Sequence, residues 1–291
     1  MNVAIDFSKC PRVPGRAYNG ANGKKIAVCY DHSVWMLKFP PSAAERPNEL
    51  SYSNSCLSEH IASTISNITG VKAQDTCLGV FVVGEKTRVV CACRDFTDGG
   101  KVFYDFCSVK NTVIDSDTNG TGTDLDDVLD TIDKQTFVET VALRDFFWDM
   151  FVVDALLGNF DRHNGNWGFL VDANTRQVEV APLFDFGSCL LPQADEKIMR
   201  RILDDKAEMD ARIHLFPMSA LKKDGRKISY VDFVQTNRLG VLERSIAKIV
   251  PRIDLQVIFN FIDQVSLLTE LQREFYKRYI QARYEALFVS R

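Results

Sequence analysis

The sequence lacks several features that would place it in a special class of protein. None of its apolar runs approaches the roughly 18 residues that a membrane-spanning helix needs. Its first residues, MNVAIDFSKCPRV, do not follow the basic-then-apolar pattern of a secretory signal. A net charge of −4 gives no positive excess of the kind that broad nucleic-acid or anionic-membrane binding requires. We therefore expect a cytoplasmic protein with no membrane span and no direct nucleic-acid partner, and we leave signal-less secretion open.

Cysteine pairs at metal-binding spacing are also missing. The eight cysteines lie at positions 10, 29, 56, 77, 91, 93, 107 and 189, and no two are spaced as C-x-x-C. Several lie within apolar, strand-like runs, as in Val90-Cys91-Ala92-Cys93. This placement favours small buried thiols in a reducing compartment over disulfides or a zinc site.

Hydrophobic periodicity divides the chain into a strand-rich part and a helix-rich part. Residues 24–30, 33–39, 77–83 and 88–96 are short, β-branched or alternating, and turn signals separate them. Between the second and third runs, a helical stripe of Leu57, Ile61, Ile65 and Ile68 follows Ser53 or Asn54 as N-cap and ends before Gly70.

The chain after about Gln135 is predicted to be mostly helical. Residues 137–158 are apolar nearly all round and predict a buried central helix, which a short hairpin follows. The pattern predicts an α+β fold of two lobes with a cleft between them. We expect an N-lobe over 1–108, an acidic connector over 109–134 and a helical C-lobe over 135–291.

A polar cluster directly after the central helix is the strongest functional signal. In FDRHNGNWGF, residues 160–169, Asp161 and Asn166 lie in a loop once Gly158 has ended the helix. Asp185, in LFDFGS, lies where the predicted hairpin returns, so three side-chain oxygens should converge at its outer ends. Such oxygens suit a proton acceptor and a magnesium site completed by substrate phosphates. Each residue taken alone could equally be a loop cap.

The N-lobe offers partners for that cluster. Strand alternation places Lys38 on the same face as Val34 and Met36, which suits a lysine that contacts nucleotide phosphates or one that reaches the solvent. Glu59, about 165° from the apolar stripe of its helix, is the candidate partner of Lys38, although a solvated position is also possible. The turn before the first long strand could place backbone amides over phosphates. Its candidate residues are Asn19, Gly20, Ala21, Asn22 and Gly23.

These motifs together resemble those of the HipA-like serine/threonine kinases of bacteria, in particular the short members of that family. The resemblance rests on GNFDRHNGNWGF, YSNSCLSEHIAS, YNG, MLKFP and DFG, and it covers roughly residues 15–290. It implies a bilobal protein-kinase-like fold that uses ATP and Mg²⁺ and phosphorylates a Ser or Thr hydroxyl of a protein, with autophosphorylation possible. The D-R-H-x-x-N order is shared more distantly with phosphoinositide kinases.

The resemblance also implies roles for the candidate residues. Asp161 would be the catalytic base or hydroxyl-orienting carboxylate, Asn166 and Asp185 would hold Mg²⁺, and Lys38 would contact the ATP phosphates with Glu59 as its partner. Cys93, Arg94 and Asp95 would form the hinge at the adenine, through their backbone atoms. His163 would brace the loop beside the nucleotide.

The sequence departs from the family pattern at two places. The turn from Tyr18 to Lys25 has no Ser or Thr that could be self-phosphorylated, and the N-terminal part is too short for the additional subdomain of HipA toxins. These departures leave a HipB-type antitoxin partner doubtful. No A-P-E segment follows Asp185, so an activation loop is not expected. Two other functions stay open: a small-molecule or lipid kinase with the same phosphoryl-transfer site, and a non-catalytic, nucleotide-binding pseudokinase.

The connector contains a pattern like that of a calcium-binding loop. Residues 115–126, DSDTNGTGTDLD, match D-x-[DN]-x-[DN]-G, but position 12 is Asp126 and no helix is expected before them. We therefore predict a mobile acidic insertion here rather than a calcium site.

Overall fold

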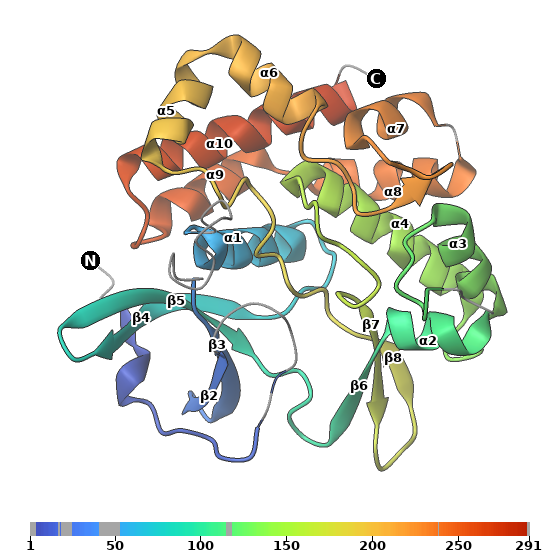
Figure 1. The fold of residues 1–291 in the computed structure, drawn as a ribbon, viewed down its shortest axis with the longest axis horizontal. Helices are drawn as coiled ribbons and strands as arrows, with labels where there is room; N and C mark the ends of the chain where they lie inside the picture. Colours follow the sequence, from blue (N-terminus) through green and yellow to red (C-terminus); the bar gives the residue numbers. More distant parts are fainter. Residues whose placement is uncertain are drawn as a thin grey trace.

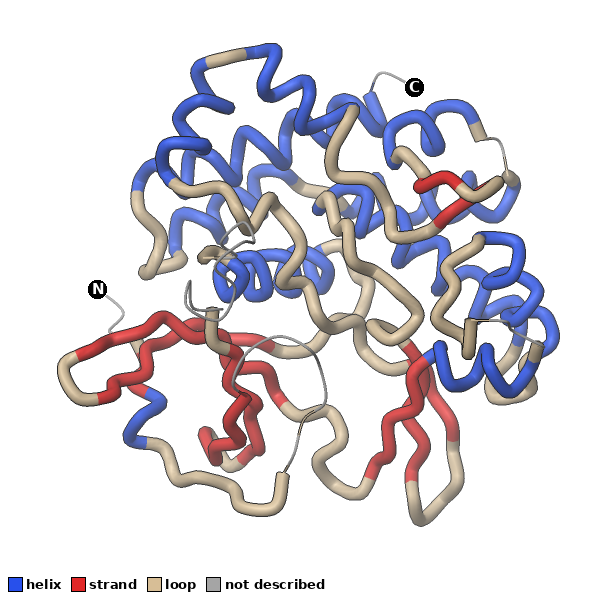
Figure 2. The backbone as a smooth tube through the Cα atoms, in the orientation of Figure 1, coloured by secondary structure: helices blue, strands red, loops and turns tan. Residues whose placement is uncertain are grey.

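The computed structural model describes residues 4–16, 18, 25–40, 53–114, 118–237 and 239–289. Strands gather in the first third of the chain and helices in the rest, in two regions that face each other across helix α1 (Figures 1 and 2). The predicted α+β class with a strand-rich N-lobe and a helical C-lobe is confirmed. No helix among the described residues combines the length and the apolar character needed to cross a membrane.

The N-lobe is built on a five-stranded sheet in the order β1-β4-β5-β3-β2. All neighbours pair antiparallel except β1, which pairs parallel with β4. Leu37 and Phe39 pack into a small core with Phe81 and Val90, while Met36 packs on the opposite face with the buried cysteines. The strands are Ile5–Asp6 (β1), Lys25–Tyr30 (β2), Ser33–Lys38 (β3), Thr76–Val83 (β4) and Lys86–Arg94 (β5).

Helix α1, Ser55–Ile68, covers the C-lobe side of this sheet and contacts β4 and β5. Its apolar stripe is buried, with Ile61 and Ile65 fully covered. Asn54 occupies the N-cap position, and Gly70 follows the helix with a φ of +81°, as the sequence predicted. The opposite side of the helix is also covered, because it faces the centre of the molecule, and this buries Glu59.

A second sheet has three strands in the order β6-β7-β8 and lies apart from the first (Figure 1). The predicted hairpin forms β7, Gly168–Asp172, and β8, Val178–Val180, while β6, Lys101–Asp105, comes from before the central helix. The expected end of the N-lobe at residue 108 therefore lies after β6, a strand that pairs with β7 from the second half of the chain. In the structure the five-stranded sheet ends at Arg94, and β6 belongs to the other sheet.

The C-lobe is organised around α4, Thr140–Leu157, most of whose residues from Phe147 onward are buried. Gly158 ends this helix with a φ of +64°, in the left-handed region that favours glycine. Helices α8 and α10 pack against α4. The other elements of this lobe are α5 (Glu196–Asp204), α6 (Lys206–His214), β9 (Lys222–Lys223), β10 (Arg226–Lys227), α7 (Tyr230–Thr236), α8 (Gly240–Ile249), α9 (Leu255–Gln264) and α10 (Glu270–Tyr284). Single helical turns occupy Phe7–Lys9, Val250–Arg252 and Glu285–Val289.

The acidic connector expected over 109–134 contains helical segments that the sequence analysis did not predict. Helices α2, Phe106–Val113, and α3, Leu125–Lys134, flank a short loop and pack against each other, and α3 packs against α4. Val128 and Ile132 enter the main core. Contrary to expectation, a helix does precede the calcium-like pattern, whose residues 115–117 lie outside the described part of the chain.

Candidate active site

Lys38, at the end of β3, links the two lobes. Its ammonium donates a hydrogen bond to Glu59 Oε2 at 2.9 Å and to Asp185 Oδ1 at 2.8 Å. Glu59 comes from α1 and its side chain is 1% exposed, so the candidate partner that the sequence named does meet Lys38. Three residues that are far apart in the sequence thus form one charged cluster.

The charges of this cluster shift the pKa values of Lys38 and Asp185 toward their ionised forms. Burial alone would lower the pKa of Lys38, but the carboxylates of Asp185 and Glu59 outweigh it and raise that pKa well above its usual value. The Lys38 ammonium in turn lowers the pKa of Asp185 to about 2, against the opposing effect of burial. One oxygen of Glu59, Oε1, is buried with no hydrogen-bond partner. A cation bound near Lys38 would therefore lie close to the carboxylates of Glu59 and Asp185.

Asp185 adopts an uncommon backbone conformation, with a φ of +59°. Non-glycine residues in this region cost free energy and are concentrated at functional sites. The next two residues support it: the Phe186 ring is fully buried beneath the Arg162 guanidinium at 4.8 Å, and a Cβ at Gly187 would lie 3.4 Å from Glu59 Oε2. The Asp185 loop is therefore held from both lobes.

Asp161 lies in the loop after α4, within the electrostatic range of Asp185. Burial and the Asp185 carboxylate raise the pKa of Asp161, while His163 and Arg162 oppose the shift. Its backbone carbonyl accepts a hydrogen bond from Asn166 Nδ2 at 2.9 Å. Because the amide nitrogen of Asn166 forms this bond, its side-chain oxygen is not part of the contact with Asp161. His163 is exposed and accepts a hydrogen bond from the Gly165 N–H, so its contact is within the loop.

The donor groups at this site suit a magnesium ion that also binds a substrate. No group of three or more His, Cys, Asp or Glu side chains arranged for a metal occurs among the residues that the structure describes. Asp185, whose side chain is 44% exposed, and Asn166 instead offer one carboxylate and one amide oxygen. Mg²⁺ is usually held by one or two carboxylates together with substrate phosphates and water, so these residues fit that metal with a bound nucleotide.

The predicted phosphate-binding turn lies outside the described residues, since Asn19 to Lys24 are not among them. The strand that follows begins at Lys25, which stands directly opposite Lys38 in the β2–β3 pairing. Burial and the Lys38 charge lower the pKa of Lys25. Sequence reasoning did not single out this second lysine, although its position after the glycine-containing turn was a signal.

The backbone of the predicted hinge is already engaged within the protein. Cys93 pairs with both β3 and β4, Arg94 N–H donates to Asp75 O, and Asp95 N–H donates to Val34 O. The Arg94 carbonyl accepts from Gln74 Nε2 at 2.8 Å. These bonds engage the N–H groups of Arg94 and Asp95 and the Arg94 carbonyl, and the hinge role of the three residues stays a prediction. The side chain of Asp95 instead accepts a hydrogen bond from the Tyr18 hydroxyl at 3.0 Å.

Phe96, two residues after the end of β5, joins an aromatic cluster that the sequence did not indicate. Its ring lies 5.5 Å from that of Phe184 and 5.8 Å from that of Phe103, and these two rings are 5.2 Å apart. Phe184 directly precedes Asp185. The cluster thus connects the chain after β5 with β6 and the Asp185 loop through apolar contacts.

Arg162 and Asn164 fix the loop that carries Asp161 and Asn166, and the sequence analysis assigned a role to neither. The buried guanidinium of Arg162 forms a two-pronged ion pair with Asp154 of α4, at 2.9 and 3.3 Å, and also donates to the carbonyls of Asn166 and Phe184. Asn164 Nδ2 donates to the carbonyls of Gly120 and Gly122, both at 2.8 Å. The loop is therefore tied to α4, to the Asp185 loop and to the α2–α3 connection.

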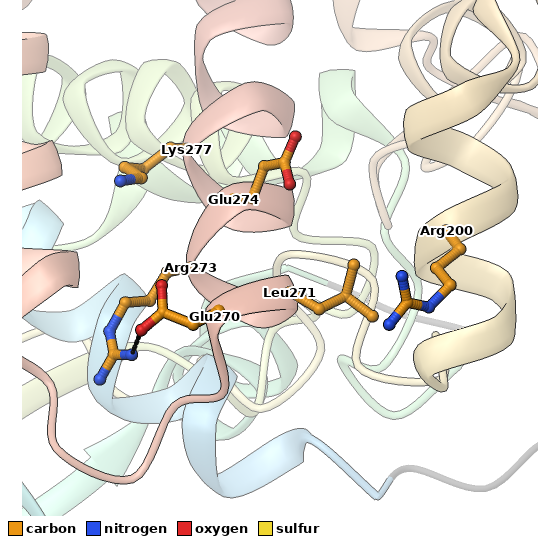
Figure 3. Close-up of a pocket in the computed structure, with 6 residues that line it drawn as sticks. All are labelled: Arg200, Glu270, Leu271, Arg273, Glu274 and Lys277. Carbon is orange, nitrogen blue, oxygen red and sulfur yellow. Dashed lines mark hydrogen bonds and ion pairs between the residues drawn. The ribbon is translucent and has the colours of Figure 1, made fainter.

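A separate pocket of about 330 Å³ lies between α5 and α10, away from these residues. Figure 3 shows Arg200 on α5 facing Leu271 of α10, while Arg273 pairs with Glu270. None of the candidate catalytic or metal-binding residues lines it. We therefore place the chemistry at the cluster of Lys38, Asp161 and Asp185.

Known proteins share both the sequence and the architecture of this chain. Serine/threonine-protein kinase CtkA of Helicobacter pylori (strain J99) is 46% identical over 273 residues, which cover 93% of this chain and 82% of that protein. The crystal structure of the Helicobacter pylori proinflammatory kinase CtkA superposes with a TM-score of 0.91 at 42% identity, over 98% of this chain and 95% of that one.

A more distant structure shows the fold alone. The HipA–HipB–operator DNA complex of Shewanella oneidensis MR-1 contains a chain that matches with a TM-score of 0.54 at 16% identity, over 94% of this chain and 67% of that one. A family model described as the HipA-like C-terminal domain matches residues 17–258. On this match and the 46% identical relative, the chain belongs to the HipA-like C-terminal domain family.

Proposed function

We propose that this chain is an ATP- and Mg²⁺-dependent serine/threonine protein kinase that can autophosphorylate. The observation that carries the proposal is the cluster in which Lys38 bridges Glu59 and Asp185 at 2.9 and 2.8 Å, with Asp161 within the electrostatic range of Asp185. A 46% identical relative named as a serine/threonine-protein kinase supports it. Phosphoryl transfer depends mainly on positioning and on neutralising charge, and this cluster offers groups for both.

Each residue of the cluster has a distinct task in this proposal. Lys38, kept protonated by its two carboxylates, neutralises phosphate charge, and Glu59 orients it. Asp185 and Asn166 would hold Mg²⁺, which when bound neutralises charge on the transferred phosphoryl group. Asp161 orients the acceptor hydroxyl and takes its proton. Because burial raises the pKa of Asp161, its carboxylate is a better proton acceptor than an exposed aspartate.

Labelled ATP with Mg²⁺ tests the proposal, with a generic protein substrate present or absent. We expect label on Ser or Thr in the wild-type protein, and a fall of at least about a thousandfold in Asp161→Ala and Asp185→Ala. Thermal unfolding should show that both variants remain folded, because both side chains are partly exposed. Asp195→Ala, at the exposed N-cap of α5, is the matched control and should keep its activity.

The same assay separates the alternative functions. Label that appears only on an added lipid or metabolite would replace a protein kinase by a small-molecule kinase. Undiminished activity in either Asp161→Ala or Asp185→Ala would refute the assignment of the site. Absence of any label with every acceptor would indicate a nucleotide-binding protein without catalysis.

A further inference from the structure

A hairpin of four basic residues lies on the C-lobe surface. Strands β9 and β10 pair Lys223 with Arg226 and Lys222 with Lys227, and all four side chains are exposed. The turn between them, Asp224-Gly225, has φ values of +52° and +74°, as a two-residue hairpin turn requires. Within the described part of the chain, none of the four basic side chains has a carboxylate within salt-bridge distance, although many other surface lysines and arginines are paired.

Two sets of hydrogen bonds fix this hairpin next to the catalytic loop. On one side, Lys222 N–H donates to Thr123 O at 2.8 Å, and Thr123 belongs to the loop whose carbonyls Asn164 binds. On the other side, the fully buried Tyr230 donates from its hydroxyl to Asn159 O at 2.6 Å, two residues before Asp161. The position of the four charges is therefore set by the same segment that positions Asp161.

The hairpin concentrates positive charge beside the segment that carries Asp161. Of its six residues, four are cations and one, Asp224, is an anion, on a protein whose net charge is −4. Such a local positive field attracts acidic segments.

An exposed apolar pair lies on the other side of the same loop. Leu215 is 73% and Phe216 is 39% exposed, and the Phe216 ring contacts that of Phe160 at 5.4 Å. Phe160 directly precedes Asp161. Pro217 fixes the pair against the end of α4, since a Cβ at Gly158 would lie 2.8 Å from its ring.

We propose that the β9–β10 hairpin and the Leu215–Phe216 pair form the docking surface for the substrate segment around the acceptor hydroxyl. The substrate is then a protein whose phosphorylated Ser or Thr is flanked by acidic residues, with an apolar side chain on the other side. This inference rests on the proposed kinase function and names its substrate class. The ligand of the hairpin is an acidic protein segment, because its exposed lysine and arginine side chains are complementary to carboxylates.

Two peptides and two double variants test the inference. Each peptide carries one serine next to a leucine, and the serine is flanked on both sides by three glutamates in one peptide and by three glutamines in the other. We expect the wild-type kcat/KM to favour the glutamate peptide by about fivefold to thirtyfold, as two exposed ion pairs allow. The preference should shrink as salt rises from 0.05 to 0.5 M.

The variant R226E/K227E changes the hairpin from four positive charges and one negative charge, that of Asp224, to two positive and three negative charges. The register places the two introduced glutamates opposite Lys223 and Lys222, so cross-strand pairs of opposite charge should keep the hairpin folded. The matched control is K197E/R200E on α5, which exchanges the same two residue types on another exposed surface and changes the net charge equally. In Figure 1, α5 and the orange strand pair near α3 lie at opposite sides of the C-lobe.

We expect the ratio of kcat/KM values for the two peptides to fall to about 1 in R226E/K227E and to stay at the wild-type value in K197E/R200E. Equal use of both peptides by the wild-type protein would overturn the inference and leave the kinase function standing. An equal loss of preference in both double variants would also overturn it, since net charge alone would then be the cause. Failure of both peptides and of self-labelling would instead remove the proposed function itself.

Discussion

Arg162 shows how much a single buried side chain contributes to this site. Its side chain is 4% exposed and that of its partner Asp154 is 2% exposed, so the pair lies in a medium of low polarity. Its remaining N–H groups reach carbonyls in both the catalytic loop and the Asp185 loop. Burial lowers the pKa of Arg162, but Asp154 more than compensates and raises it. The residue thus fixes the relative positions of Asn166 and Asp185 without contacting a substrate.

Arg162→Ala should destabilise the protein by about 3–5 kcal/mol, because it leaves the Asp154 carboxylate buried without a counter-ion. Urea unfolding followed by tryptophan fluorescence measures the change. Arg278→Ala, which removes an exposed arginine from α10, is the control and should change stability by less than about 0.5 kcal/mol. A loss below about 1 kcal/mol in Arg162→Ala would show that the pair is not part of the structural core of the site.

The candidate residues could be predicted from the sequence where a motif specifies both the residue types and their order along the chain. Asp161, Asn166 and Asp185 follow a buried helix at the spacing of a loop and a hairpin, and Lys38 lies on a strand with the expected alternation. Arg162 and Asn164 lie within the same motif, yet their partners Asp154 and Gly120 could be assigned only by the fold. Gln74 and Asp75, which form hydrogen bonds with the backbone of Arg94, likewise lie outside the motif that suggested the hinge.

Helix α1 is held against the C-lobe through His60 as well as through its apolar stripe. His60 Nδ1 lies 3.0 Å from Thr76 Oγ1 of β4, and its ring contacts that of Phe261 of α9. Burial lowers the pKa of His60 to about 4, from 6.5 in the unfolded chain, although the Thr76 contact opposes the shift. The folded protein therefore keeps this histidine neutral at a pH at which the unfolded chain binds a proton.

The free energy of unfolding should fall as the pH decreases from 7 to 5. Below pH 6.5 His60 binds a proton in the unfolded state, whereas in the folded state it stays neutral down to about pH 4. His60 should contribute about 1–2 kcal/mol to this loss. Urea unfolding at both pH values measures it, and His60→Gln should remove that contribution. The same slope in His60→Gln and the wild type would contradict the role of this residue.

Most elements near the site were predictable because their periodicity agrees with their burial. The strands around Lys38, α1, α4 and the β7–β8 hairpin all follow from alternation or from helical spacing. The exceptions are β6, α2 and α3. In α3 an acidic composition obscured a helical spacing of Leu125, Val128 and Ile132, which the structure buries. The prediction gave more weight to the acidic composition of this segment than to its helical spacing. Asp124, whose side chain caps the N-terminus of α3, was a further helix signal.

At the scale of the whole molecule, the two lobes are joined at several points around the cleft. The Gln74 N–H donates to Leu183 O at 2.8 Å, and the Asn54 N–H donates to Pro192 O at 3.1 Å. The ion pair of Lys38 with Asp185 adds a connection in the centre. A nucleotide bound there with its metal would exchange this direct pair for contacts of both residues with phosphate and cation.

Mg²⁺ with ATP should therefore raise the melting temperature by about 5 °C at a hundred times the dissociation constant, since only the folded state binds. Differential scanning fluorimetry measures the shift. Lys38→Met lowers the starting value, because it leaves Glu59 buried and unpaired, and should lose most of the nucleotide-dependent shift. Lys101→Met, on the exposed surface of β6, should keep it. A full shift in Lys38→Met would place the nucleotide elsewhere.

The pairing of β6 with β7 has a consequence for how the protein can be divided. Strand β7 lies between β6 and β8 and pairs with β6 from Gly168 to Asp172. A fragment that begins at Gln135 would lose β6 and leave β7 as an open sheet edge with unpaired N–H and C=O groups. Such edges template intermolecular pairing, so this fragment would tend to aggregate. A fragment that begins at Lys101 would keep β7 paired on both sides, so it should aggregate less than the fragment that begins at Gln135.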